Sequence, residues 1–195
     1  MLEVSMPHLG VVLDALPPPV FLETEERISR ERFEALCQAN PDLRIEMTAQ
    51  GKVIVMPPVH SRTGEQNAEI NFQLKLWTRS DGSGVAFDSS TGFYLPNGAN
   101  RSPDASWVLE SRITSLPLQE QEGFLPLCPD FVLELRSDSD SLPSVMEKMQ
   151  EYMDNGARLG WLIDPRNEDV YVYRPGKEPE KREFPASVRI EILIG

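Results

Sequence analysis

The 195-residue sequence contains only two cysteines, and this scarcity argues against several classes of protein. Cys37 and Cys128 lie far apart and form no Cys-x-x-Cys pair, whereas zinc sites and secreted disulfide frameworks need clustered or numerous cysteines. Two isolated thiols are instead typical of buried apolar side chains. The sequence therefore predicts a protein of the reducing cytoplasm.

Long apolar runs are missing as well. No stretch is long enough to span a bilayer, and the segment before Asp14 has neither a basic start nor a continuous apolar core. We therefore expect no signal peptide and no membrane association. Internal repeats, low-complexity segments and charged tails are also lacking, so residues 21–195 are predicted to form a single domain behind an irregular N-terminal arm, residues 1–20.

Basic residues are scarce relative to acidic ones. The sequence has 19 Lys and Arg against 31 Asp and Glu, which gives a formal net charge of −12. Such a charge is unfavourable for binding a polyanion such as nucleic acid. It does not exclude that function, because an acidic protein can line one groove with basic side chains and a bound divalent cation reverses the local charge.

Hydrophobic periodicity and turn residues predict alternating helices and strands. Helices are expected near residues 29–40, 61–79 and 143–155. Strands are expected at 43–47, 52–56, 85–87, 92–95, 105–109, 131–135, 159–163, 170–173 and 188–192, the last two as edge strands. The strand-helix-strand unit from Phe131 to Ile163 implies a parallel crossover, whereas the first two strands suit an antiparallel hairpin. The predicted fold is α/β (α+β), a mixed β-sheet flanked by helices.

Two carboxylates stand out within this pattern. Asp104 opens one strand after Ser102 and Pro103, and Glu134 lies inside the apolar run Phe131–Leu135. Asp104 alone is more often a turn-initiating residue. A charge inside an apolar strand is costly unless it is paired or bound to metal. Glu134 is therefore a stronger indication of a functional site than Asp104. If the two strands are neighbours, the carboxylates can converge on a hard cation.

The same residues carry a family resemblance. Ser-Pro-Asp104 followed by Leu-Glu134-Leu-Arg136 resembles the split active-site motif of the PD-(D/E)xK nuclease superfamily. From about Ser29 to Tyr173, the order and spacing of further blocks resemble the Uma-type restriction endonucleases of bacteria. These blocks are 33–36, 45–46, 51–58, His60, 103–108, 129–137, 147–152 and 155–165.

The resemblance implies a restriction-endonuclease-like fold and metal-dependent cleavage of nucleic acid phosphodiesters, with DNA as the expected substrate. It implies that Asp104 and Glu134 bind Mg²⁺, or Mn²⁺ in its place, with the Leu135 carbonyl and Glu46 as further ligands. Glu65 is a weaker candidate because it matches no clear family position, and a solvated helix residue explains it better.

One departure from the superfamily concerns its lysine two residues after the glutamate, which is replaced here by Arg136. Arginine stays protonated and cannot act as a general base, although it can hold a phosphate. Lys148 on the following helix matches a family position and is the candidate catalytic lysine; an ordinary surface lysine explains it equally well. Arg136, Arg101 and His60 are candidate substrate-binding residues, and His60 equally suits a helix start without chemistry.

Two functions follow from these residues. The first is a magnesium-dependent endodeoxyribonuclease, a hydrolase, which the joint presence of Asp104, Glu134 and Lys148 favours. The second is a catalytically degenerate nuclease fold that binds nucleic acid or protein, which the net acidity and Arg136 favour. RNA cleavage shares the same metal chemistry. A homodimer is expected, because cutting both strands of a duplex suits twofold symmetry.

Overall fold

The computed structural model describes residues 20–22 and 28–183, and the observations below concern these residues. The chain divides into two compact units, residues 1–58 with 97–101, and residues 59–96 with 102–195. We refer to them as unit 1 and unit 2. The predicted arm, apart from Val20, and the predicted strand at 188–192 lie outside the described residues, and the single domain at 21–195 stays a prediction.

Unit 1 consists of one helix and a small antiparallel sheet. α1 (Arg30–Ala39) begins after Ser29, whose hydroxyl accepts a hydrogen bond from the Arg32 N–H at 3.3 Å. β2 (Arg44–Met47) and β3 (Val53–Met56) form the predicted antiparallel hairpin. The short strands β1 (Val20–Leu22) and β6 (Asn100–Arg101), which the sequence did not predict, extend it in the order β1-β3-β2-β6.

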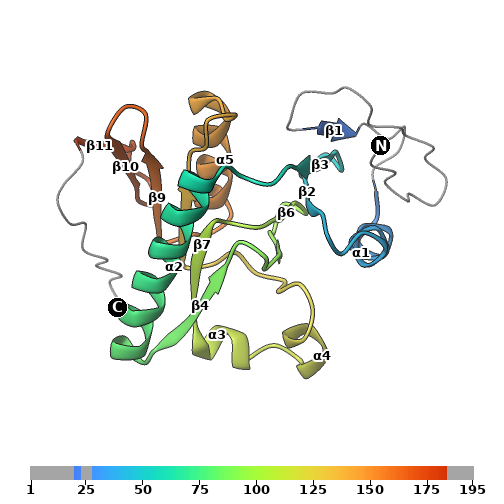
Figure 1. Ribbon diagram of the computed structural model, residues 1–195. Helices are drawn as coiled ribbons and strands as arrows, with labels where there is room; N and C mark the ends of the chain where they lie inside the picture. The colour runs from blue at the N-terminus through green and yellow to red at the C-terminus, as the bar shows by residue number, and fades with distance from the viewer. Residues whose placement is uncertain (1–19, 23–27, 184–195) are drawn as a thin grey trace. The chain divides into compact units, whose positions relative to one another are not determined.

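Unit 2 is built on a six-stranded mixed sheet in the order β11-β10-β9-β8-β7-β4 (Figure 1). Its strands are β4 (Gly84–Asp88), β7 (Ala105–Leu109), β8 (Phe131–Leu135), β9 (Leu159–Asp164), β10 (Asp169–Tyr173) and β11 (Glu180–Glu183). β8 and β9 are parallel and are joined through α5 (Leu142–Asp154), while the other neighbours pair antiparallel. The predicted mixed sheet and parallel crossover are therefore confirmed.

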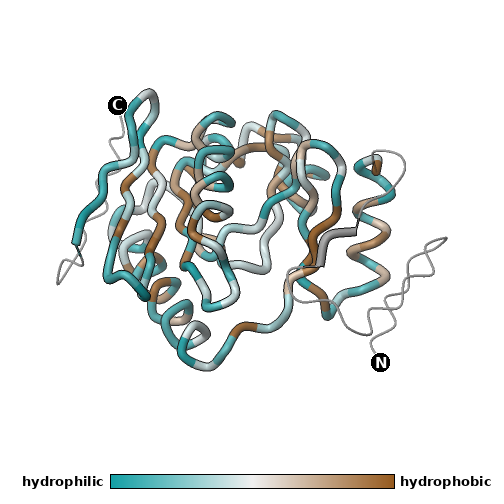
Figure 2. The backbone as a smooth tube through the Cα atoms, turned by 90° about the horizontal axis from the view of Figure 1, so that it is seen from above, coloured by the Kyte–Doolittle hydropathy of each residue, from teal (hydrophilic) through white to brown (hydrophobic). Residues whose placement is uncertain are grey.

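The prediction that β10 is an edge strand is wrong, because β11 pairs with its outer side. β11 consists of four exposed polar residues without apolar alternation, so its sequence carries no strand signal. Its tube has the teal, hydrophilic colour in Figure 2. β5 (Phe93–Tyr94) lies within the strand expected at 92–95. The short helices α3 (Glu110–Thr114) and α4 (Leu118–Gln121) were not predicted.

Two helices cover the two faces of the unit 2 sheet. Odd-numbered residues of the central strands form a hydrophobic core with α2 (Ser61–Asp81), in which Trp77 meets Trp107 edge-to-face at 5.5 Å between ring centroids. Even-numbered residues of the same strands face α5. Gly160 of β9 lies so close to this helix that a Cβ atom added to it would be 2.6 Å from the Met149 methyl carbon. Residues 104 and 134 belong to this even-numbered face. Among the described helices, none is long and apolar enough to cross a membrane.

Candidate active site

The strand register places Asp104 opposite Glu134. Ala105 of β7 pairs with Leu133 of β8, so the next position of this antiparallel ladder sets residue 104 across from residue 134. The Leu135 N–H donates a hydrogen bond to Asp104 Oδ2 at 2.9 Å, which fixes the Asp104 carboxylate against β8. Both residues are buried, with 8% and 6% of their surfaces exposed. Asp104 and Glu134 therefore lie at opposite positions where β7 begins and β8 ends.

Helix α5 brings two donors to Glu134. The Lys148 Nζ lies 2.8 Å from Glu134 Oε1, and the Tyr152 hydroxyl donates to the same oxygen at 3.0 Å. Residues four apart lie on one face of a helix, so both side chains reach the strand together. Tyr152 is assigned no role at the site from the sequence, although it ends the block 147–152 that resembles the family. Its spacing from Lys148 was the signal that could have identified it.

Helix α2 holds the main chain at Asp104 from the other side of the sheet. The Asn71 Nδ2 donates to the Asp104 carbonyl oxygen at 3.0 Å and to the Asn67 carbonyl oxygen at 3.0 Å. The start of β7 is thereby anchored to a long helix as well as to β8. Asn71 was not singled out from the sequence, because an isolated amide on a helix carries no pattern.

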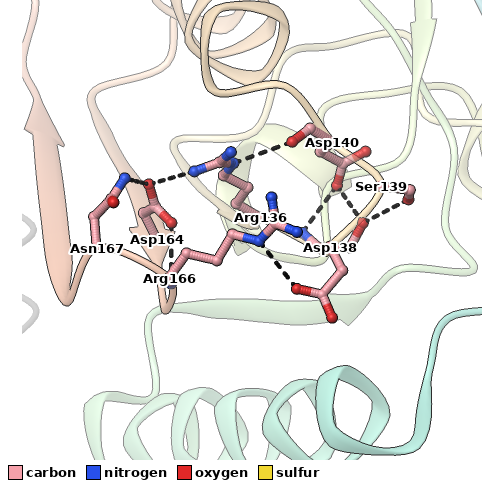
Figure 3. A network of polar contacts seen from close by, with 8 residues as sticks. Arg136, Asp138, Ser139, Asp140, Asp164, Arg166 and Asn167 are labelled. Carbon is pink, nitrogen blue, oxygen red and sulfur yellow. Dashed lines mark hydrogen bonds and ion pairs between the residues drawn. The ribbon is translucent and has the colours of Figure 1, made fainter.

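Arg136 belongs to a polar network at the ends of β8 and β9 (Figure 3). Its Nη1 lies 2.8 Å from Asp164 Oδ2, and its Nε donates to the Asp140 carbonyl oxygen at 3.1 Å. Asn167 donates to the same Asp164 oxygen at 2.8 Å. Burial opposes ionisation of Asp164, but the hydrogen bonds from Arg136 and Asn167 outweigh it and hold the pKa of this carboxyl below its usual value. Arg136 therefore ties the loop after β8 to the end of β9. Phosphate binding by Arg136 stays a prediction.

Two other predicted site residues belong to unit 1 and pair with each other. The Arg101 Nη1 lies 3.0 Å from Glu46 Oε2, and both residues are buried. The two charges of this cross-strand pair offset each other within unit 1. Metal binding by Glu46 and substrate binding by Arg101 stay predictions.

The remaining candidates lie on α2. His60 is exposed at the N-cap of this helix without a side-chain capping hydrogen bond, and Glu65 is exposed in its first turns. Among the residues that the structure describes, neither side chain makes a hydrogen bond or an ion pair. A role for either one therefore has no contact to support it.

The donor set at the carboxylate pair suits a hard divalent cation. In the described part of the chain, no group of three or more His, Cys, Asp or Glu side chains is arranged to hold a metal. Asp104 and Glu134 instead offer two carboxylates, with the Leu135 carbonyl in the same strand. Mg²⁺ is commonly bound by one or two carboxylates while it keeps water and substrate phosphate as its other ligands. Oxygen donors without sulfur or imidazole also favour Mg²⁺ or Mn²⁺ over zinc.

The structure has a mixed sheet, two carboxylates on adjacent strands and a lysine from the crossover helix. These features agree with a restriction-endonuclease-like fold. The chain belongs to the Uma2 family, described as "Putative restriction endonuclease", which it matches over residues 30–194. The family resemblance and the fold class predicted from the sequence are thereby confirmed.

One solved structure agrees with this assignment. The chain is similar to a crystal structure of "a putative nuclease belonging to DUF820" from Anabaena variabilis ATCC 29413, with 25% sequence identity and a TM-score of 0.64. The similarity covers 75% of this chain and 80% of that one. No curated protein matched the sequence.

Proposed function

We propose that the protein is a metal-dependent endonuclease that hydrolyses phosphodiester bonds in DNA. The observation that supports this most strongly is the buried pair of Asp104 and Glu134 on neighbouring strands, with the Lys148 ammonium 2.8 Å from Glu134. Membership of a family described as restriction endonucleases agrees with it. In this proposal the protein acts in the cytoplasm as a twofold dimer, so that each copy cuts one strand of a duplex.

Each site residue has a distinct role in the proposed reaction. Asp104 and Glu134 hold Mg²⁺ or Mn²⁺, with the Leu135 carbonyl as a further ligand. When bound, the cation supplies positive charge to the scissile phosphate and lowers the pKa of the attacking water. Lys148 is already ion-paired with a carboxylate, so we assign it electrostatic stabilisation of the phosphate rather than proton abstraction.

The proposed activity is tested by incubating supercoiled plasmid with the purified protein in Mg²⁺ or Mn²⁺. We expect conversion to nicked and linear DNA with either metal and none in EDTA, because the carboxylate pair cannot polarise phosphate alone. Single- and double-stranded RNA form a parallel arm that identifies the nucleic acid. Retained DNA binding without cleavage of either substrate would instead favour the non-catalytic module.

Lys148→Met should lower the nicking rate by about 10²- to 10³-fold, the usual effect of removing one preorganised electrostatic group. Methionine keeps the aliphatic length of the side chain but lacks the ammonium. Mn²⁺ binding, measured by calorimetry, should persist because both carboxylates remain. Lys75→Met, at an exposed lysine of α2, is the matched control. Unchanged nicking by a folded Lys148→Met protein would make Lys148 only a structural partner of Glu134.

A further inference from the structure

We propose that Tyr152 is a positioning residue that orients the Glu134 carboxylate for the divalent cation. This inference rests on the proposed metal-dependent function. Its starting observation is that the Tyr152 hydroxyl donates to Glu134 Oε1 at 3.0 Å, from a side chain that is fully buried.

The hydrogen bond restricts a rotation that glutamate otherwise has. The last torsion of a glutamate side chain is broad, so the carboxylate plane is not set by the side chain itself. Tyr152 and Lys148 both meet Oε1 from the same face of α5. Because the carboxylate is planar, fixing one oxygen also fixes the direction of the other.

The two donors differ in how they affect a cation. The Lys148 ammonium is positive and repels a cation bound to the same carboxylate. The Tyr152 hydroxyl is neutral, so it can orient Glu134 without adding positive charge. Partners of this kind, which hydrogen-bond to a metal-binding side chain, typically change metal affinity or activity by about 10- to 100-fold when they are removed.

The main chain at Tyr152 is itself firmly held. Its carbonyl oxygen accepts hydrogen bonds from the Ala157 N–H at 3.0 Å and the Asn155 N–H at 3.2 Å. The Cys128 thiol donates to the same oxygen at 3.5 Å, and burial raises the pKa of this thiol to about 12, so it stays protonated. The hydroxyl is therefore presented from a fixed point at the end of α5.

Tyr173 provides a matched control on the same side of the sheet. It is almost fully buried in β10, and its Cβ lies close to Gly160 beneath α5. In the described part of the chain, its hydroxyl has no hydrogen-bond partner. Tyr173→Phe thus removes a buried hydroxyl without touching Glu134.

The experiment compares Mn²⁺ binding by full-length wild type, Tyr152→Phe and Tyr173→Phe, using calorimetry and Mn²⁺-dependent thermal stabilisation. We expect Tyr152→Phe to bind Mn²⁺ about 10- to 100-fold more weakly. Its plasmid nicking should recover as Mn²⁺ is raised, because both carboxylates remain. Tyr173→Phe should match the wild type in both measurements.

Wild-type Mn²⁺ affinity and wild-type metal dependence in Tyr152→Phe would overturn the proposal. So would a Tyr152→Phe protein that fails to fold while Tyr173→Phe folds, since the hydroxyl would then serve core stability. Failure of the proposed function is distinguishable, because in that case the wild type itself binds no Mn²⁺ and nicks no plasmid. Lys148→Met gives a further separation: it should lose cleavage without weaker Mn²⁺ binding, the reverse of the Tyr152→Phe pattern.

Discussion

Glu134→Gln should nearly abolish plasmid nicking, with a rate more than about 100-fold below that of the wild type. Replacing a residue that only supports a metal ligand already costs about 10- to 100-fold, and loss of a ligand charge should exceed this. Glutamine has almost the same shape and can still accept the Tyr152 hydrogen bond, so the fold should persist. Calorimetric Mn²⁺ binding should be lost together with the nicking.

Glu147→Gln is the control for this substitution. Glu147 precedes Lys148 on α5 and is exposed, so its variant makes the same chemical change beside the site but outside it. It should nick plasmid at the wild-type rate. Nicking by folded Glu134→Gln within a few-fold of the wild type would remove Glu134 from the proposed metal site.

Arg136→Ala should lower the free energy of unfolding by about 3–5 kcal/mol at pH 7, as expected when one partner of a buried ion pair is removed. The reason is that Asp164 is fully buried and would lose the guanidinium that lies 2.8 Å from its Oδ2. Urea denaturation followed by circular dichroism measures this change. The loss of stability should therefore appear whether or not substrate binding also weakens.

Arg166→Ala provides the comparison within the same network. Arg166 pairs with Asp138 at 3.1 Å, but these side chains are 48% and 65% exposed, so breaking the pair should cost at most about 1 kcal/mol. Figure 3 shows both arginines in one cluster, and burial is the main difference between the two pairs. An Arg136→Ala cost no larger than that of Arg166→Ala would contradict the expectation.

The pH dependence of the Arg136→Ala effect follows from the lowered pKa of Asp164. A carboxyl whose pKa is lower in the folded state contributes stability above its unfolded pKa, about 3.9. That contribution is lost as the pH falls through the folded pKa. The difference between wild type and Arg136→Ala should therefore be fully present near neutral pH and should shrink below about pH 4.

The sequence was sufficient where a local pattern and a physical cost coincide. The apolar run Phe131–Leu135 predicts a buried strand, and Glu134 within it requires a partner. The spacing of α5 predicts that Lys148 lies at the border of its buried face, from which its ammonium reaches Glu134. Both inferences depend on residues close together in the chain or on a strong local signal.

The sequence was insufficient where a contact joins distant segments. The sequence indicates a phosphate-binding role for Arg136, because nothing local reveals its actual partner. That partner, Asp164, lies 28 residues later at the end of the neighbouring parallel strand. The spacing of Tyr152 from Lys148 places both on one face of α5, but the acceptor of its hydroxyl becomes evident only when α5 packs on β8. Such partners are fixed by strand order and helix packing, which periodicity does not encode.

The distribution of tryptophan gives the protein a built-in optical reporter. All three tryptophans, Trp77, Trp107 and Trp161, belong to unit 2, and Trp107 is fully buried in its edge-to-face contact with Trp77. Intrinsic tryptophan fluorescence therefore records the melting of the α2-covered core alone, whereas circular dichroism records the helices and strands of both units. A fluorescence transition displaced from the dichroism transition would reveal that the two units unfold separately.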